Sequence, residues 1–510
     1  MAKPKSYLKQ SKAKPKNEQK LNTADDFQSA GVEFEEAAGK WRAGDAAKSM
    51  RFFQRAVDVY DQGLRKFPQN ADLAYNKARV QLEIATHPIL VDQLRRPLKD
   101  VLEEALASHR YALQLEPDNS DALFNTSQVL TTIAEVMASD GDEEDPKSGS
   151  EVEALKILQE ALELQTRCLN VQERKYHEFL EQERAADRQG EDTNDPPPAA
   201  LVENPTSGDV EDVGDVEDVE DDGEWFNVVE PVTKDTLIDT LLAQLGTLTT
   251  FCSILSSSPA VAPANTLPWA EELSASLLGK MQAMSHDQIE MLQEIALAKG
   301  NLASAMLEAG YRSGKINAET YKRERDSAFS ATELQLGSSI EGLLANARSL
   351  LALYSALAEA ENGDAQSQST IRWNVATAAI ANLKSASAVQ GISQEDLVTT
   401  HLLRGDASLY LCAMAFPPTS HQTAANTATQ NAKNAEVYYR NASRLTRDRE
   451  EKDISSMKSA VAQYMQAYSQ GQVHGDIGDL LSASPRGPEW AIGQVGDMVA
   501  ENLVPPGVFS

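Results

Sequence analysis

The sequence contains few of the residues that cross-link a protein or bind metals. Its 510 residues include three cysteines, Cys168, Cys252 and Cys412, which lie far apart, and seven scattered histidines without a pair at ligand spacing. No stretch approaches the roughly 18 apolar residues of a membrane span, and the N-terminus lacks the apolar region of a secretory signal. These absences predict a soluble intracellular protein with no disulfide framework, no metal, no cofactor and no membrane partner.

Catalytic signatures are missing as well. The sequence has no Gly-rich phosphate loop of the GxxxxGK[ST] or GxGxxG type, no GxSxG, no HExxH and no CxxC. Carboxylates are plentiful, but a catalytic pair needs a pocket that shifts its pKa values, and a solvated acidic run provides none. We therefore predict that the protein is not an enzyme. The alternative is an enzyme without a recognisable motif.

The charge balance is strongly acidic. Lys and Arg number 47 against 77 Asp and Glu, which gives a formal net charge of −30. Such a field repels phosphate, so direct binding of nucleic acid or of an anionic membrane is not expected. A partner rich in Lys and Arg would be attracted, with fast and salt-sensitive association.

Composition divides the chain into stretches of different character. Residues 1–20 carry seven lysines against the single acid Glu18, which is typical of either a nuclear-import signal or a solvated terminus. Further on, apolar residues recur at helical spacing, as where Phe53, Ala56, Val57 and Tyr60 share one face. The predicted organisation is a basic disordered tail (1–25), helical repeats (26–189), an acidic disordered insertion (190–230), C-terminal helical repeats (231–470) and a tail (471–510).

An internal repeat appears when residues 60–85 are placed over residues 109–134, at an offset of 49 residues. Pro68 then pairs with Pro117, and Asn70 pairs with Asn119. The proline cannot continue a helix, and the asparagine side chain can cap the helix that follows. The repeated unit is therefore a helix, a proline turn and a second helix.

This unit resembles the tetratricopeptide repeat (TPR). The family's closing pattern of small, aromatic and small residues before a proline matches Ala56, Tyr60, Gly63 and Pro68, and again residues 105–117, although the offset of 49 exceeds the usual period of 34. The resemblance implies an all-α, TPR-like helical-hairpin solenoid, interrupted by a long acidic disordered loop. An ordinary helical bundle with a chance repeat is the alternative.

In proteins of this family, the first helix of each repeat lines a concave groove that binds an extended peptide or a helix. Matching AYNKAR and LFNTSQ to the repeat places Tyr75, Arg79, Phe124 and Gln128 in the groove, with core packing as the alternative for the two aromatic residues. Family members that bind Hsp70 and Hsp90 tails use a clamp of Lys, Arg and Asn. Here Asn76 matches the clamp, but its cations are missing, so an Hsp70/Hsp90 co-chaperone is a minor alternative.

The acidic insertion separates helical stretches on both sides. Residues 187–231 contain sixteen acids and one base, Arg188, so they cannot bury a core and are expected to be disordered in isolation. Candidate partner-binding residues in this block are Asp209, Glu211, Asp212, Asp215, Glu217, Asp218, Glu220, Asp221, Asp222 and Glu224.

A basic tail joined to an acidic helical solenoid resembles, in architecture and charge, the dedicated chaperones that escort new ribosomal proteins into the nucleus. That likeness implies an assembly chaperone that shields a Lys/Arg-rich client, such as a ribosomal protein or a histone, in the cytoplasm and the nucleus. The alternative is a TPR scaffold subunit of a multiprotein complex, in which the acidic insertion is only a spacer. Loss of binding at high salt or without the insertion would favour the chaperone.

Overall fold

The computed structural model describes residues 21–139, 148–191, 232–257, 263, 265–284, 291–359, 365–472, 478, 484 and 486–509. Within these residues the regular structure is helical and no strand occurs. The helices are α1 (Ala24–Arg42), α2 (Ala46–Lys66), α3 (Ala71–Thr86), α4 (Pro88–Val91), α5 (Leu98–Leu115), α6 (Ser120–Ser139), α7 (Ser148–Glu191), α8 (Lys234–Ser257), α9 (Thr266–Met284), α10 (Leu292–Arg312), α11 (Ala318–Ala328), the 3-10 turn η3 (Thr332–Leu334), α12 (Ile340–Glu359), α13 (Ala365–Ala386), α14 (Gln394–Ala413), α15 (Gln422–Leu445), α16 (Arg449–Ser469) and α18 (Pro488–Ala500). The predicted all-α class is confirmed.

The prolines and asparagines of the predicted repeat end and begin helices at the positions that the sequence predicts. Helix α2 ends just before Pro68, and the backbone N–H of Leu73 donates to the Asn70 side chain at 2.8 Å at the start of α3. Helix α5 likewise ends before Pro117, and the N–H of Ala122 donates to Asn119 at 2.9 Å. Each asparagine therefore satisfies one free backbone N–H at the start of the helix that follows its proline turn.

A glycine facing a tyrosine holds two of the hairpins together. Tyr60 of α2 is fully buried against Gly31 of α1, so closely that a Cβ on Gly31 would lie 2.2 Å from the ring. Tyr439 of α15 is buried in the same way against Gly405 of α14. Only glycine allows the two helices of each hairpin to approach so closely.

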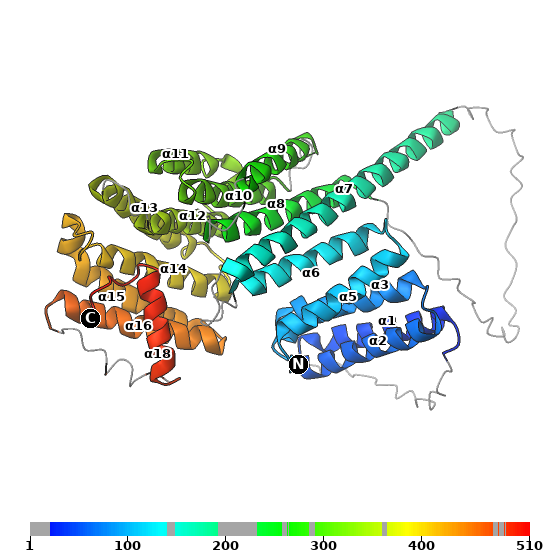
Figure 1. The fold of residues 1–510 in the computed structure, drawn as a ribbon, viewed down its shortest axis with the longest axis horizontal. Coiled ribbons are helices and arrows are strands. Elements are labelled where there is room, and N and C mark those ends of the chain that lie inside the picture. The colour runs from blue at the N-terminus through cyan, green and yellow to red at the C-terminus, as the bar shows by residue number, and fades with distance from the viewer. Residues whose placement is uncertain are drawn as a thin grey trace, which may run out of the picture.

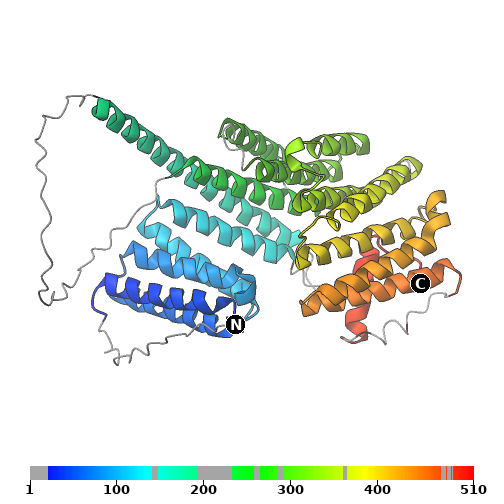
Figure 2. The same ribbon diagram turned by 180° about the vertical axis from the view of Figure 1, so that it is seen from behind.

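The helices follow one another as antiparallel hairpins. Helix α1 packs on α2, α3 on α5, α6 on α7, α12 on α13 and α14 on α15, while α8 and α10 join the two halves through α7 and α12. Figures 1 and 2 show an N-terminal arm (α1–α5) and a C-terminal arm (α12–α18) on either side of the central helices α6–α10. The helical-hairpin solenoid is confirmed.

The array curves towards the first helix of each hairpin. Successive first helices contact one another: α1 contacts α3, α3 contacts α6, α12 contacts α14, and α14 contacts α16. Among the described helices, the second helices α2, α5, α13 and α15 approach one another less closely. The face of the first helices is therefore the inner face of the solenoid.

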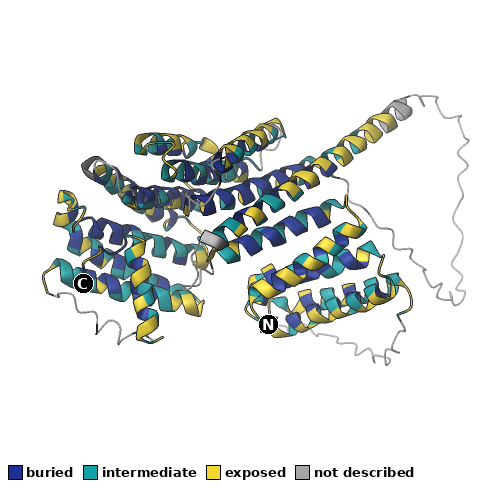
Figure 3. Cartoon of the chain, in the orientation of Figure 1, coloured by how far each residue is buried: buried dark blue, intermediate teal, exposed yellow. Residues whose placement is uncertain are grey.

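Two long helices occupy the centre. Helix α8 is long and apolar enough to cross a membrane by length and composition, but 61% of its most apolar window is buried, as in the core helix of a soluble protein. Its neighbour α7 extends beyond the packed body, and residues 181–185 are all exposed (Figure 3).

The C-terminal end is closed by α18, which packs against α16. Its buried residues Ala491, Val495 and Met498 join the core of the C-terminal arm, together with Leu503 and Val504. The division of the chain into the five predicted segments stays a prediction. Residues 1–20 of the basic tail, and residues 192–231 with every acidic candidate from Asp209 to Glu224, lie outside the described residues.

Candidate functional site

The inner face of the C-terminal arm is hollowed. Two adjoining hollows, of about 450 Å³ and 690 Å³, share Thr399, Asp448 and Glu451. They are formed by α12, α14 and α16 and by the turn between α15 and α16. We call this surface the C-terminal groove.

The groove combines apolar residues with an excess of acids. Its apolar residues are Val398, Leu402, Leu403, Leu445 and Ile454. Five acids against three bases line it: Glu395, Asp406, Asp448, Glu450 and Glu451, with Arg348, Arg447 and Lys458. Such a surface suits a segment that offers both cations and aliphatic side chains.

The turn before α16 fixes the acidic wall of the groove. The backbone N–H of Glu451 donates to the Asp448 carboxylate at 2.6 Å, so Asp448 caps the helix. The Thr446 hydroxyl donates in turn to the Glu451 carboxylate. Because both carboxylates are held by local bonds, the wall is formed before any partner arrives.

Asp406 joins three helices at one end of the groove. Its carboxylate accepts a hydrogen bond from the Tyr439 hydroxyl of α15 at 2.8 Å and pairs with Lys458 of α16 at 3.0 Å. Burial disfavours the charged lysine, but Asp406 and then Glu501 raise the pKa of Lys458 above its ordinary value. This inner-face bridge therefore neutralises one acid of the groove from within the protein.

A second inner-face bridge occurs in the N-terminal arm. The Tyr60 hydroxyl of α2 donates to Glu35 of α1 at 2.5 Å, and Arg79 of α3 pairs with the same carboxylate. Burial, followed by the hydrogen bond to Glu35, raises the pKa of Tyr60 above its ordinary range. Burial opposes the charge of Arg79, whereas Glu35 raises its pKa.

The predicted groove residues lie on α3 of the N-terminal arm and on the central helix α6, the first helices of their hairpins. Asn125 donates to the Tyr75 hydroxyl at 3.2 Å, whereas Phe124 packs against the cluster of Leu123, Cys168 and Val171. Gln128 is half-buried further along α6. Arg79 is already paired with Glu35, so a partner would have to compete for its guanidinium.

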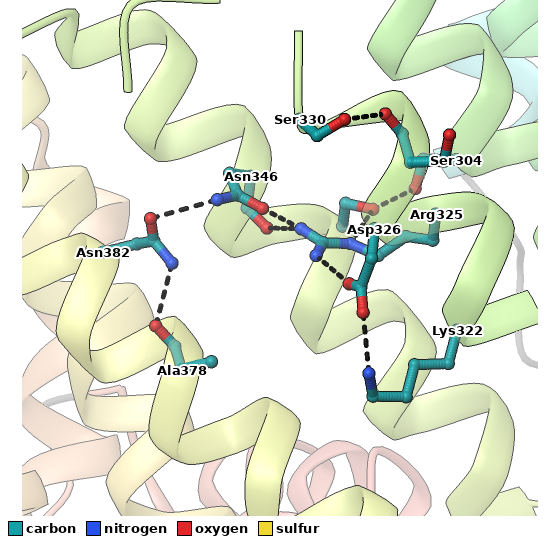
Figure 4. Close-up of polar contacts among 10 residues, drawn as sticks. Ser304, Lys322, Arg325, Asp326, Ser330, Asn346, Ala378 and Asn382 are labelled. Carbon is teal, nitrogen blue, oxygen red and sulfur yellow. Dashed lines mark hydrogen bonds and ion pairs between the residues drawn. The ribbon is translucent and has the colours of Figure 1, made fainter. Parts of the chain in front are cut away.

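A buried arginine between α11, α12 and α13 forms a further polar cluster (Figure 4). The side chain of Arg325 is 5% exposed and donates to Asp326, Ser349 and Asn346. Asn346 donates onward to Asn382 at 3.0 Å. Burial lowers the pKa of Arg325, opposed by Asp326. Because its donors are occupied within the protein, this cluster ties helices together rather than presenting a free cation.

The described part of the chain also bears on two further kinds of chemistry, metal binding and histidine titration near pH 7. No group of three or more His, Cys, Asp or Glu there is arranged to hold a metal ion. His109 is fully buried at a repeat position, and burial lowers its pKa to about 4. It therefore remains neutral in the folded protein near pH 7.

The sequence predicts helical repeats over residues 231–470 but no candidate residue in the C-terminal groove, because the aligned repeat covers only residues 60–134. A signal was present: Gly405 precedes Tyr439 much as Gly31 precedes Tyr60. The two pairs are separated by 34 and 29 residues, however, so no fixed period reveals them. Aligning such glycine–tyrosine pairs identifies the α14–α15 hairpin, in which α14 supplies one wall of the groove.

These features define an all-α helical-hairpin repeat protein with a charged inner face. No family model matches the chain. The UPF0656 protein C926.02 of Schizosaccharomyces pombe is 34% identical over 160 residues, which are 31% of this chain and 34% of that protein. The uncharacterized protein YNL193W of Saccharomyces cerevisiae is 36% identical over 92 residues, 17% of this chain and 16% of that protein. The matched region thus spans about a third or less of these curated relatives.

Solved structures with a similar succession of helices are distant. The S. pombe nuclear import adaptor Nro1 has a TM-score of 0.35 at 10% identity, covering 84% of this chain and 98% of Nro1. Yeast Tom70 has a TM-score of 0.15 at 10% identity, covering 93% of this chain and 96% of Tom70. Similarity at these TM-scores and identities is no evidence of what the chain binds.

Proposed function

We propose that the protein is a non-catalytic protein-binding repeat protein that escorts a Lys/Arg-rich client, such as a ribosomal protein or a histone. The single observation that carries the proposal is the C-terminal groove, where acids and aliphatic residues lie together on the inner face. The net charge of −30 supports it, because the whole chain attracts a basic segment.

In this proposal, apolar contacts and charged contacts contribute different properties to binding. The half-buried aliphatic residues Leu402 and Ile454 receive apolar side chains of the client, and this burial supplies affinity. The exposed acids Glu395 and Glu450 at the rim attract its cations, which raises the association rate and the salt sensitivity. The acidic block from Asp209 to Glu224 adds a second source of negative charge, and its part in shielding is a hypothesis.

Affinity purification tests the class of partner. The full chain and a version lacking residues 190–224 are purified from cells at low and at high salt, and the retained proteins are identified. Recovery of one Lys/Arg-rich protein, lost at high salt or without the block, supports the escort function. Recovery of the same neutral partners in every condition would instead support a scaffold.

Charge reversal tests the groove itself. In Glu395→Lys/Glu450→Lys, two rim acids become cations, and binding of a labelled peptide of alternating Lys, Arg and Leu should weaken about tenfold at low salt. Glu163→Lys/Glu319→Lys changes the net charge equally at exposed positions outside the groove and serves as the control. Equal binding by both variants would remove the groove from the proposal.

The scaffold and the Hsp70/Hsp90 co-chaperone remain the alternatives. A scaffold would bind through the apolar residues of the groove and would tolerate salt. A tail-binding co-chaperone would prefer a peptide ending in EEVD over the basic peptide. Residence in the cytoplasm and the nucleus is part of the escort proposal, and removal of residues 1–20 with imaging of the tagged chain tests whether the basic tail contributes to import.

A further inference from the structure

A pocket of about 770 Å³ lies on the outer face of the N-terminal arm, away from the C-terminal groove. Its walls come from the second helices α2 and α5 and from the connection between α4 and α5, and α3 forms its floor. Met50, Val57, Ile84, Leu94 and Val101 supply apolar surface.

The pocket gathers cations in a chain with a large excess of acids. Arg51, Arg95 and Arg96 line it, against Asp58 and Glu104. Arg96 pairs with Glu104, whereas no ion pair of Arg51 or Arg95 is found among the described residues. Both of these arginines are exposed, so their guanidinium groups are available to a carboxylate from outside.

The floor of the pocket contains an unused acceptor. Gln81 is 5% exposed, and its Nε2 donates to Glu104 at 2.9 Å. Its Oε1 is buried and has no hydrogen-bond partner in the described structure. A buried carbonyl oxygen without a donor is costly. Because this oxygen exposes almost no surface, a ligand N–H group reaches it only after the Gln81 side chain turns toward the pocket, and the new hydrogen bond then relieves that cost.

We propose that this arginine pocket (Arg51, Arg95, Arg96 and Gln81, with the apolar residues named above) binds an acidic peptide segment of a partner protein. Carboxylates of the segment would meet Arg51 and Arg95, a backbone N–H would donate to Gln81, and an aliphatic side chain would cover Ile84. A phosphate ion offers neither the backbone donor nor the aliphatic group, so a peptide fits the lining better. The inference is independent of the proposed function, because it concerns another face and the opposite charge.

With such a site, the protein would bind oppositely charged partners on two different faces. The inner face of one arm attracts a basic segment, and the outer face of the other arm attracts an acidic one. The two partners would therefore occupy separate surfaces at the same time. An escort of this kind can be recognised by a second protein while its client stays bound.

The test uses the full chain and a fluorescein-labelled peptide of alternating Asp, Glu and Leu, followed by anisotropy. Arg51→Glu/Arg95→Glu should weaken binding about tenfold or more, because two charge-assisted contacts are replaced by repulsion. Lys99→Glu/Lys175→Glu changes the net charge equally at exposed positions outside the pocket and should bind like the unaltered chain. Gln81→Leu, with its helix content checked by circular dichroism, should also weaken binding.

Three results would overturn the proposal. The first is equal binding by the pocket variant and the control variant. The second is equal binding of the acidic peptide and a peptide with Asn and Gln in place of Asp and Glu. The third is binding only by a chain that lacks residues 190–224, since the pocket would then belong to the protein's own acidic block. None of these outcomes depends on whether the C-terminal groove binds a basic peptide.

Discussion

The contact between Gly405 and Tyr439 gives a sharp prediction for stability. In Gly405→Ala the new Cβ would lie 2.4 Å from Tyr439 Cε1, so the ring would have to retreat by more than half an ångström. Tyr439 is fully buried and its hydroxyl is held by Asp406, which leaves little room to move. Overpacking costs about 1–3 kcal/mol, and the better helix propensity of alanine returns up to about 1 kcal/mol. We expect a net loss of about 1–2 kcal/mol.

A matched substitution separates packing from helix propensity. Gly279 lies within α9 and is exposed, and a Cβ there would meet nothing within 4 Å. Gly279→Ala should therefore stabilise by about 0.5–1 kcal/mol. The assay is urea unfolding followed by circular dichroism, with hydrogen exchange of α14 and α15 to locate the effect. If Gly405→Ala is as stable as Gly279→Ala, the reasoning about the close helix approach is wrong.

Three further predictions concern buried polar groups. Lys458→Met should lower the free energy of unfolding by about 1–2 kcal/mol, because Asp406 loses its cation, and an unchanged urea midpoint would contradict the role of the inner-face bridge. Burial lowers the pKa of His109 from 6.5 to about 4, so the unfolded chain binds more protons between these values. Stability should therefore fall as the pH is lowered through that window, and His109→Leu should flatten the pH dependence. Burial raises the pKa of each of the three cysteine thiols to about 12, so iodoacetamide should label them only after unfolding, and labelling of the folded chain would contradict this.

Local signals made the N-terminal repeats predictable. Proline, asparagine caps and the buried face of Ala56, Tyr60 and Gly63 all act within a few residues of the chain, so the sequence displays them directly. The turns in these repeats fall where Pro68 and Pro117 predict them.

The site was harder to predict because it depends on distant residues. Arg79 meets Glu35 from 44 residues away, and Lys458 meets Asp406 from 52 residues away. The groove arises only when α14 and α16 come together after α15 has returned the chain. Periodicity places a charged residue on a face of its own helix. It does not show which oppositely charged residue of the next hairpin pairs with that residue.

The two inner-face bridges also bear on the mechanics of the arms. Each fastens one first helix to the next, Glu35 to Arg79 in one arm and Asp406 to Lys458 in the other. Straightening a curved array lengthens its inner edge, so it must stretch these bonds, whereas tighter bending leaves them intact. The arms should therefore resist straightening more than further bending. A segment bound along the inner face would then be enclosed more tightly by bending of the arm, while straightening of the arm to release it would be opposed.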